Sequence, residues 1–311
     1  MKSIGEVLES DSRWQMLQER ARRAEEELYK HELIVPLLER YPAEQFSIRE
    51  LREYRDTNAN CKQCQGLEGC RNPLQGHRML LTAEEGYSPT FAYTRCNFQK
   101  SHDYQRKIKS LIKSQFVPDH IVNTTFETLE KDAGRIEALK AAIHFCVSFE
   151  RGKTTRGLYI YGPFGVGKSA IVGAMAQELA KRGVDVLMVY VPDYLMEIKG
   201  SIETGGMEQK LEALKKVSVL ILDDIGAEAI TAWTRDEVLG PILQSRMEKL
   251  PTIYTSNLTL DELERHFANA KNEHSPNYRS AARIMERIEP FVQFCEVKGR
   301  NRRRDQKQAP S

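Results

Sequence analysis

The chain has 311 residues, 41% of them hydrophobic and 29% charged, so its length and apolar content suit two globular domains. No stretch approaches the ~18–20 apolar residues of a transmembrane helix, and the polar N-terminus lacks the apolar core of a signal peptide. The 46 Lys and Arg residues against 44 Asp and Glu residues give a net charge of +2, so any contact with nucleic acid must come from local basic patches. We therefore expect a cytoplasmic protein with no membrane partner.

The first sixty residues have the pattern of charged helices. Apolar residues recur at spacings of three and four between Trp14 and Leu28, which places them on one face of a helix. A second short helix is expected over 33–40. The sequence from Ser47 to Glu50 is that of a capping box, which opens a third helix.

Four cysteines follow in a segment, 57–97, that we expect to be rich in loops because it contains few large apolar residues. They are Cys61, Cys64, Cys70 and Cys96. In a reducing compartment, clustered cysteines bind metal more often than they pair as disulfides. The Cys61-x2-Cys64 spacing places two thiolates on one zinc ion, and the other two cysteines and His77 supply more donors than the four that zinc needs. A structural ion would stabilise a segment that lacks a core of its own.

Residues 99–120 are basic and polar, and we place a linker at 106–125 between an N-terminal domain, 1–105, and a C-terminal domain, 126–311. From about residue 121, strands alternate with helices, which predicts a parallel α/β sheet. The expected strands are 157–161, 184–191, 217–222, 251–255 and 291–297, and the expected helices are 168–182, 192–203, 234–249, 259–268 and 278–287. The isolated Cys146 and Cys295 stand among apolar residues and are expected to be buried.

The strongest motif is a phosphate-binding loop, G-x4-G-K-S, between an apolar strand and an apolar helix. It consists of Gly162, Pro163, Phe164, Gly165, Val166, Gly167, Lys168 and Ser169. The glycines let backbone N–H groups turn towards phosphate oxygens, and the N-terminus of the helix adds a favourable dipole. Lys168 can reach the terminal phosphates and the Ser169 hydroxyl can bind Mg²⁺. The motif predicts a nucleotide triphosphate site.

Two other strand ends supply polar groups to this site. An apolar strand ends in Asp223 and Asp224, of which the first is expected to hold Mg²⁺ and the second to orient the attacking water. The strand before Asn257 ends in an amide that can hydrogen-bond this water or the γ-phosphate, unless Asn257 instead caps the next helix. No guanine-reading N-K-x-D or T-K-x-D motif is present, which disfavours a GTPase.

The three strand-end motifs, in this order and spacing, resemble those of the AAA+ ATPases, and within them the bacterial replicative helicase loaders of DnaC and DnaI type. The similarity lies in YIYGPFGVGKS, VLILDDIGAE, WTRDEVLGPILQSRM, PTIYTSN and AARIMERI, and the cysteines of the N-terminal region indicate the DnaI branch. The resemblance implies an AAA+ domain without the usual C-terminal helical lid, since about fourteen residues follow the last strand. It also implies a small, mainly helical zinc-binding domain before it.

The resemblance assigns roles to single residues. Arg287 matches the arginine finger that reaches the ATP of a neighbouring subunit, with Arg246 and Arg283 as alternatives. Arg300 or Arg302 would replace the arginine of the missing lid. For the metal, the resemblance implies a set of four zinc ligands with Cys70 as the alternative: Cys61, Cys64, His77 and Cys96.

The family's function would make this chain a loader that places the hexameric replicative DNA helicase on single-stranded DNA at replication initiation and restart, with weak ATP hydrolysis as a switch. The implied partners are the helicase, bound by residues 1–105, single-stranded DNA, other primosome proteins, and further copies of the ATPase domain. The element at 192–206 would face DNA, with Lys199 as a candidate contact. The basic residues that could contact phosphates are, near the linker, Arg106, Lys107, Lys109 and Lys113 and, near the C-terminus, Lys298, Arg300, Arg302, Arg303, Arg304 and Lys307.

The main alternative is a transposition helper or initiator-type ATPase that binds double-stranded DNA. The N-terminal cysteine cluster favours the loader, because transposition helpers with a similar ATPase pattern usually lack it. A small-molecule kinase is disfavoured, since no lid or acceptor-binding segment is present.

Overall fold

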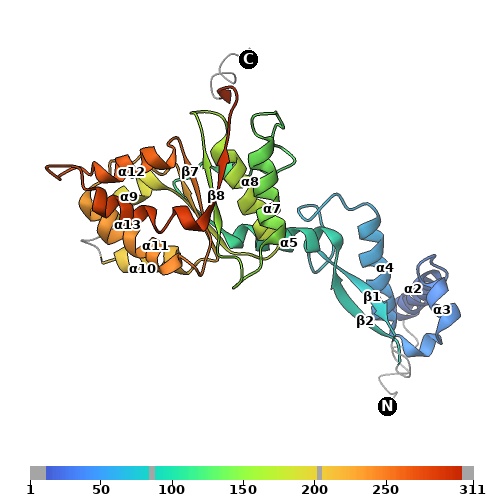
Figure 1. The fold of residues 1–311 in the computed structure, drawn as a ribbon. Coiled ribbons are helices and arrows are strands. Elements are labelled where there is room, and N and C mark those ends of the chain that lie inside the picture. The colour runs from blue at the N-terminus through green and yellow to red at the C-terminus, as the bar shows by residue number, and fades with distance from the viewer. Residues whose placement is uncertain (1–11, 84–87, 202–204, 303–311) are drawn as a thin grey trace, which may run out of the picture. The chain divides into compact units, whose positions relative to one another are not determined.

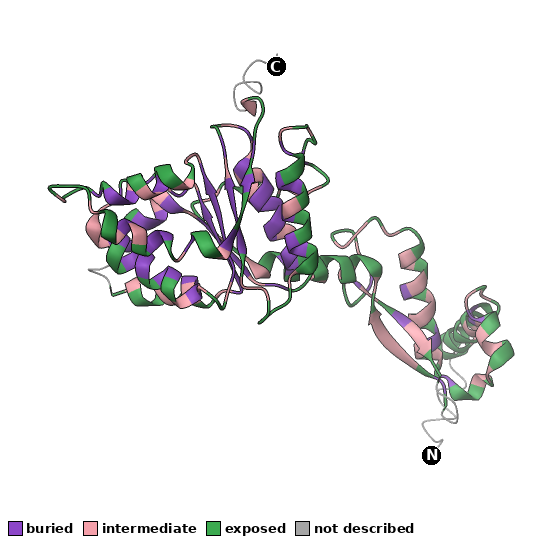
Figure 2. Ribbon diagram, viewed as in Figure 1, coloured by how far each residue is buried: buried purple, intermediate pink, exposed green. Residues whose placement is uncertain are grey.

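The computed structural model describes residues 12–83, 88–201 and 205–302, and the chain divides into two compact units, Met1–Gln105 and Arg106–Ser311 (Figure 1). Each unit has its own core, as the buried residues in Figure 2 show. Within the described ranges, no helix is both long and apolar enough to cross a lipid bilayer.

The first unit is a small helical domain with a β-hairpin. Its elements are α2 (Ser12–Tyr29), α3 (Val35–Arg40), η1 (Ala43–Gln45), α4 (Ile48–Lys62), β1 (His77–Thr82), β2 (Thr90–Arg95) and the first part of α5 (Asn97–Leu111). The expected capping box is confirmed: the Glu50 N–H donates to Ser47 Oγ at 3.2 Å, and the Ser47 N–H donates to Glu50 Oε2 at 2.9 Å. The core is small, with Leu28, Ile34 and Leu51 fully buried.

The segment 57–97, which is expected to be rich in loops, has neither helix nor strand over 63–76 but contains regular elements on both sides of that stretch. Helix α4 continues to Lys62, and β1 pairs with β2 in antiparallel register, with His77 opposite Arg95. Met79 is the buried residue of β1, and β2 has none. The hairpin therefore lacks the alternation of buried and exposed residues by which a strand is recognised in a sequence.

The second unit is an α/β domain with a parallel sheet, as predicted. After the end of α5 its elements are β3 (Ile112–Gln115), α6 (Asp119–Val122), α7 (Ile136–Ser148), β4 (Gly157–Tyr161), α8 (Lys168–Lys181), β5 (Val186–Tyr190), α9 (Val191–Gly200), α10 (Met207–Lys216), β6 (Val219–Asp223), the π-helical turn η2 (Thr234–Leu239), α11 (Gly240–Arg246), β7 (Thr252–Ser256), α12 (Leu260–Ala268), α13 (Tyr278–Met285), η3 (Glu289–Phe291) and β8 (Val292–Glu296). The strands lie in the order β3-β5-β6-β7-β4-β8, and all pairs are parallel.

Helices cover both faces of this sheet (Figure 1). On one face, alternate strand residues such as Leu220 and Leu222 pack with α9 to α13, and on the other, Val219 and Ile221 pack with α7 and α8. Burial on both faces explains why β4, β5 and β6 are nearly continuous apolar runs. Since β7 lies between β4 and β6, the carboxyl ends of these three strands are adjacent.

Residues 106–125 are not a linker. They contain the end of α5, strand β3 and helix α6, and β3 is the edge strand of the sheet, with Ile112 opposite Val186. The alternation of Lys113 and Gln115 with half-buried Ile112 and Ser114 is that of an edge strand, but at four residues it is too short to be recognised in a basic segment.

The two isolated cysteines are buried, as predicted. Cys146 is 0% exposed and Cys295 is 5% exposed, both in the core on the α7 and α8 side of the sheet. Burial raises the pKa of Cys146 to about 12 and the pKa of Cys295 to about 11. Both are therefore neutral, unreactive thiols near pH 7.

Candidate nucleotide site

A cavity of about 790 Å³ opens at the carboxyl ends of β4, β6 and β7. Of the predicted site residues, the ones that line it are Phe164, Gly165, Gly167, Lys168, Ser169, Asp223, Asp224 and Asn257. Gly162 and Pro163 lie at its base and offer their carbonyls to the lysine, while Val166 is buried in the core. The structure therefore brings the three strand-end motifs together around one space.

The loop between β4 and α8 depends on glycine at two points. At Gly162, a Cβ atom would lie 2.0 Å from the carbonyl oxygen of Val297, so only glycine lets the end of β8 approach. Gly167 has φ of 94° directly before α8, a conformation that other residues rarely adopt. The turn exposes the N-terminus of α8 to the cavity, which suits a phosphate group.

Lys168 is 7% exposed and is held at the base of the cavity. Its Nζ donates to the carbonyls of Gly162 at 2.7 Å and Pro163 at 2.9 Å, and to Asn257 Oδ1 at 2.7 Å. A phosphate oxygen must replace some of these acceptors before the ammonium group can contact it.

Asp223 is a buried carboxylate that is oriented by two hydroxyl groups. Thr255 Oγ1 donates to its Oδ1 at 2.6 Å, and the Ser169 hydroxyl also hydrogen-bonds it. Burial is the main cause that raises the pKa of Asp223, and the charge of Asp224 raises it further. An adjacent hydroxyl and carboxylate are the pair that holds Mg²⁺ in P-loop proteins, so Ser169 and Asp223 fit that ion.

Asp224 lies beside the amide of Asn257. Asn257 Nδ2 donates to Asp224 Oδ1 at 2.7 Å, and the Asp224 N–H donates to Thr255 Oγ1 at 2.8 Å. Asp224 has φ of 60°, and such strained backbone is frequent at functional sites. The alternative that Asn257 caps the next helix is wrong, because Thr259 is the N-cap of α12.

The other end of the cavity was not predicted. It is lined by Phe116, Pro118, His120, Ile121 and Thr124, which lie in α6 or within three residues of its ends. This apolar and aromatic lining suits a flat base. No short motif in the sequence marks these residues, because their place beside the phosphate-binding loop depends on the pairing of β3 with β5.

The three candidate finger arginines differ in exposure. Arg246 is 1% exposed and its guanidinium is bonded to Thr252 Oγ1 and to four backbone carbonyls, so it is a structural residue. Arg283 is exposed on α13. Arg287 is half-buried, with Nε donating to Gln244 Oε1 at 2.7 Å and Nη1 to the carbonyl of Arg283 at 2.9 Å. Arg287 does not line the cavity of its own chain, and its role as a finger stays a prediction.

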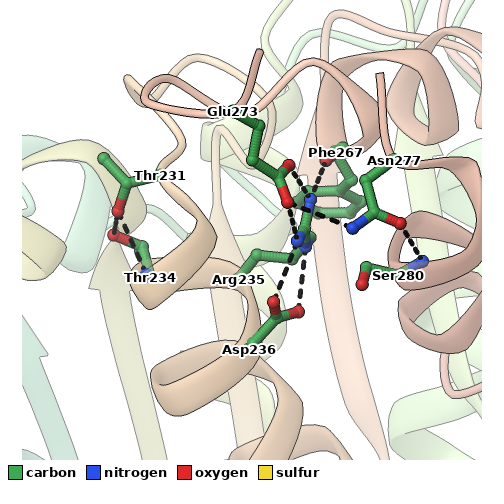
Figure 3. Close-up of polar contacts among 8 residues, drawn as sticks. All are labelled: Thr231, Thr234, Arg235, Asp236, Phe267, Glu273, Asn277 and Ser280. Carbon is green, nitrogen blue, oxygen red and sulfur yellow. Dashed lines mark hydrogen bonds and ion pairs between the residues drawn. The ribbon is translucent and has the colours of Figure 1, made fainter. Parts of the chain in front are cut away.

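A buried polar cluster holds the start of α13, the helix that leads to Arg287 (Figure 3). Arg235 is fully buried in η2, bonds both oxygens of Asp236 and of Glu273, and donates to the carbonyl of Phe267. Glu273 in turn accepts from Asn277 Nδ2 at 3.1 Å, and Asn277 Oδ1 accepts from the Ser280 N–H to cap α13. The start of α13 is thus tied to η2.

Of the two C-terminal arginines proposed to replace a lid arginine, only Arg302 lines the cavity. Its Nη1 donates to the carbonyl of Val166 at 3.0 Å, and it is ion-paired with Glu130 and Asp132. Arg300 also pairs with Glu130, at 3.2 Å. Lys199 is exposed on α9, whereas residues 202–204 of the predicted DNA-facing element, and Arg303, Arg304 and Lys307, lie outside the described residues.

The predicted zinc ligands do not form a metal site in the structure. Within 12–83, 88–201 and 205–302, no three His, Cys, Asp or Glu side chains are grouped closely enough to hold an ion. Each sulfur has a local contact: Cys61 accepts from Asn72 Nδ2, Cys70 from the Gly76 N–H and Cys96 from the Gln99 N–H, and Cys64 donates to the Gly66 carbonyl. The cysteines are free thiols rather than disulfides.

Comparison with known proteins places the chain among ATP-binding proteins. The profile of the IstB-like ATP binding protein family matches residues 99–309. The chain is 38% identical over 259 residues to the replicative helicase loader DnaI of Bacillus subtilis, a match that covers 83% of each protein. It is 27% identical over 198 residues to the ATP-binding protein of insertion sequence IS5376 from Geobacillus stearothermophilus, covering 61% of this chain and 76% of that protein.

Comparison with solved structures agrees with the sequence comparison. A crystal structure of DnaI superposes with a TM-score of 0.55 and 44% sequence identity, covering 63% of this chain and 99% of that one. The expected AAA+ type of P-loop fold is confirmed by this match and by the strand order.

Proposed function

The chain belongs to the IstB-like ATP-binding family and, within it, to the replicative helicase loaders, and from this premise we propose that it loads a hexameric replicative DNA helicase onto single-stranded DNA, with ATP as the switch. The observation that carries the proposal is the match to a named loader over 83% of each protein, which at 259 residues is longer than the ATPase unit, Arg106–Ser311, and so extends into the N-terminal unit.

ATP binding follows from the chain's own residues. Lys168 would exchange its contacts with the carbonyls of Gly162 and Pro163 for phosphate oxygens, and Ser169 with Asp223 would hold Mg²⁺. Bound ATP supplies the γ-phosphate that hydrolysis removes. Asp224, held by Asn257, would accept a proton from the attacking water. Hydrolysis by the isolated chain is expected to be weak, because Arg287 does not line its own cavity and would act on a neighbouring copy.

The N-terminal unit would bind the helicase. On α2, Trp14 is 39% exposed, and Met16 and Leu17 are each 57% exposed, while Leu28 is the buried residue of this helix. In the described part of the chain, the predicted apolar face of α2 is thus largely exposed, as is Met16 beside it, and exposed apolar surface of this kind marks a binding site for another protein.

The test uses the full-length chain and the hexameric replicative helicase of the same cell. Size-exclusion chromatography with ATP should show co-elution for the wild type, and Leu17→Asp should abolish it without affecting ATP binding. Val147→Asp is the matched control, since Val147 has the same 57% exposure on a helix of the ATPase unit. Absence of co-elution for the wild type in every nucleotide state would reject the loader function.

A second function is favoured by the family profile and by the similarity to the insertion-sequence protein: a transposition helper that binds double-stranded DNA. The two proposals differ in the DNA that they require. A loader should retain single-stranded oligonucleotide in preference to the duplex at equal salt, with ATP present, and a transposition helper should show the reverse preference.

Zinc remains a proposal for the cysteine cluster. The donors Cys61, Cys64, His77 and Cys96 have suitable chemistry, but the contacts described above would have to be replaced for them to converge on one ion. Elemental analysis of protein purified without chelator decides the point. Less than about 0.1 zinc per chain would leave the cluster as free thiols; stoichiometric zinc would require a different local arrangement.

A further inference from the structure

Arg135 is a buried cation in the wall of the nucleotide cavity. It directly precedes α7, is 1% exposed, and lines the cavity together with Gly167 and Lys168. Its Nη1 donates to the carbonyl of Glu130 at 2.9 Å and its Nη2 to the carbonyl of Gly167 at 3.5 Å. Its Nε is buried and has no hydrogen-bond partner in the part of the chain that the structure describes.

The charge of Arg135 is not matched by an ion pair among the described residues. The acidic group that acts on it is Glu130, whose carboxylate is exposed and is already bonded by Arg300 and Arg302. Burial is the main cause that lowers the pKa of Arg135. Of the other two buried arginines described above, Arg235 is bonded by two carboxylates and Arg246 by five neutral acceptors, whereas Arg135 has two neutral acceptors and a buried Nε without one among the described residues.

The guanidinium lies directly behind the last glycine of the phosphate-binding loop. A Cβ atom on Gly167 would be 3.1 Å from Arg135 Nη2, and α8 begins at the next residue, Lys168. In a loop of this kind the phosphates bind on the amide side, at the N-terminus of the helix. The positive charge of Arg135 therefore stands close to where the negative charge of a nucleotide would be.

We propose that Arg135 is a positioning residue for the nucleotide phosphates, whose negative charge serves as the counter-ion that this buried cation lacks. The inference rests on the proposed ATP binding and deepens it. Because the interaction is between charges across the loop, the contribution of Arg135 grows with the charge of the ligand, from AMP to ADP to ATP. In the nucleotide-free protein, the same unpaired charge disfavours the fold.

The test is calorimetric titration of the full-length protein with ATP, ADP and AMP. Arg135→Gln keeps a polar amide at the position of the Arg135 Nε but removes the charge, and should weaken ATP binding about tenfold or more, ADP less, and AMP least. Arg135→Lys keeps the charge and should restore most of the ATP affinity. Lys140→Gln removes a charge from the exposed side of α7, where Lys140 pairs with Glu137, and should leave all three affinities unchanged.

Thermal unfolding without nucleotide separates this role from a purely structural one. The unfolding midpoint of Arg135→Gln should equal or exceed that of the wild type, because removing the buried charge outweighs the loss of its two bonds to carbonyls, of which one is long at 3.5 Å. The proposal is overturned if this variant fails to fold or unfolds at a lower temperature, or if Gln and Lys variants weaken the three nucleotides by the same factor; Arg135 would then only support the 130–135 turn. A wild type that binds no ATP would instead reject the proposed function, and this inference with it.

Discussion

Replacing Arg246 by alanine should unfold the ATPase unit at a lower temperature without removing a catalytic group. The guanidinium of Arg246 bonds to no residue that lines the nucleotide cavity. It donates to Thr252 Oγ1 and to four backbone carbonyls at 2.7–3.3 Å, those of Leu214, Lys215, Val217 and Pro251. The carbonyls at the end of α10 have no partner within their own helix, so Arg246 acts as a cap that ties α10 and α11 to the start of β7.

The loss of stability expected for Arg246→Ala can be worked out from these four carbonyls. A buried acceptor left without a donor costs about 1–3 kcal/mol, and the lower value applies where water can enter the vacated space. Four carbonyls at ~1 kcal/mol each give a loss of about 4 kcal/mol, which is a large part of the ~5–15 kcal/mol that stabilises a typical domain. For a unit of this size the unfolding midpoint should fall by about 10 °C. Lysine should not rescue, since one ammonium cannot reach all five acceptors.

The assay compares Arg246→Ala with Arg287→Ala, using thermal unfolding and ATP hydrolysis in the complex with helicase and DNA. Arg287 contacts Gln244 and the carbonyl of Arg283 near the surface, so its loss should leave the midpoint within about 2 °C of the wild type while hydrolysis in the complex falls. If Arg246→Ala unfolds at the wild-type temperature but loses only stimulated hydrolysis, the reasoning is refuted and Arg246 becomes the finger. Unchanged hydrolysis in Arg287→Ala would transfer that role to Arg283.

Three further substitutions address the cavity. Lys168→Ala should abolish ATP binding in calorimetry while co-elution with the helicase through the N-terminal unit persists; wild-type affinity for ATP would contradict the phosphate-binding assignment. Asp223→Asn should raise the unfolding midpoint of the nucleotide-free protein near pH 8, because the raised pKa of Asp223 makes its ionised form destabilising. This difference should shrink as the pH falls and vanish about one pH unit below the unfolded pKa of ~3.9, where the carboxyl is protonated in both states. A midpoint difference that does not depend on pH would contradict this. Asn257→Ala removes an acceptor that competes with phosphate for Lys168, so ATP affinity should be kept or increase while hydrolysis falls, and a large loss of ATP affinity would show that Asn257 mainly binds the nucleotide.

The nucleotide-binding half of the fold could be predicted because its signals are local. The phosphate-binding loop lies within eight consecutive residues, and the strand that ends in Asp223 is a continuous apolar run. The parallel order of strands then brings the motifs together without further information, because the carboxyl ends of parallel strands lie on one edge of a sheet.

The parts that were not predicted depend on contacts between residues far apart in the chain. The status of Arg246 as a buried cap is set by carbonyls about thirty residues before it, which no spacing in the sequence reveals. The strand at Ile112–Gln115 is recognisable only through its pairing with β5, and the hairpin of the first unit through the register of its two strands. The buried charge of Arg135 likewise depends on the close approach of Gly167.

The polar side chains of the nucleotide site are bonded to one another across adjacent strands, which indicates which segments around the site can move when ATP binds. A continuous set of bonds joins Lys168 to Asn257, Asn257 to Asp224, and both aspartates to Thr255, across three adjacent strands of a sheet that is buried on both faces. Such a sheet has little freedom to move. Of the two segments that border the loop, 298–302 is held by ion pairs of Arg300 and Arg302 with Glu130 and Asp132, and 116–124 by bonds within its own short helix and by one bond from Gln177 to the Val122 carbonyl. Exposed ion pairs and a small number of bonds rearrange at low cost. ATP binding should therefore change protection from hydrogen exchange in these two segments and leave β6 and β7 unchanged.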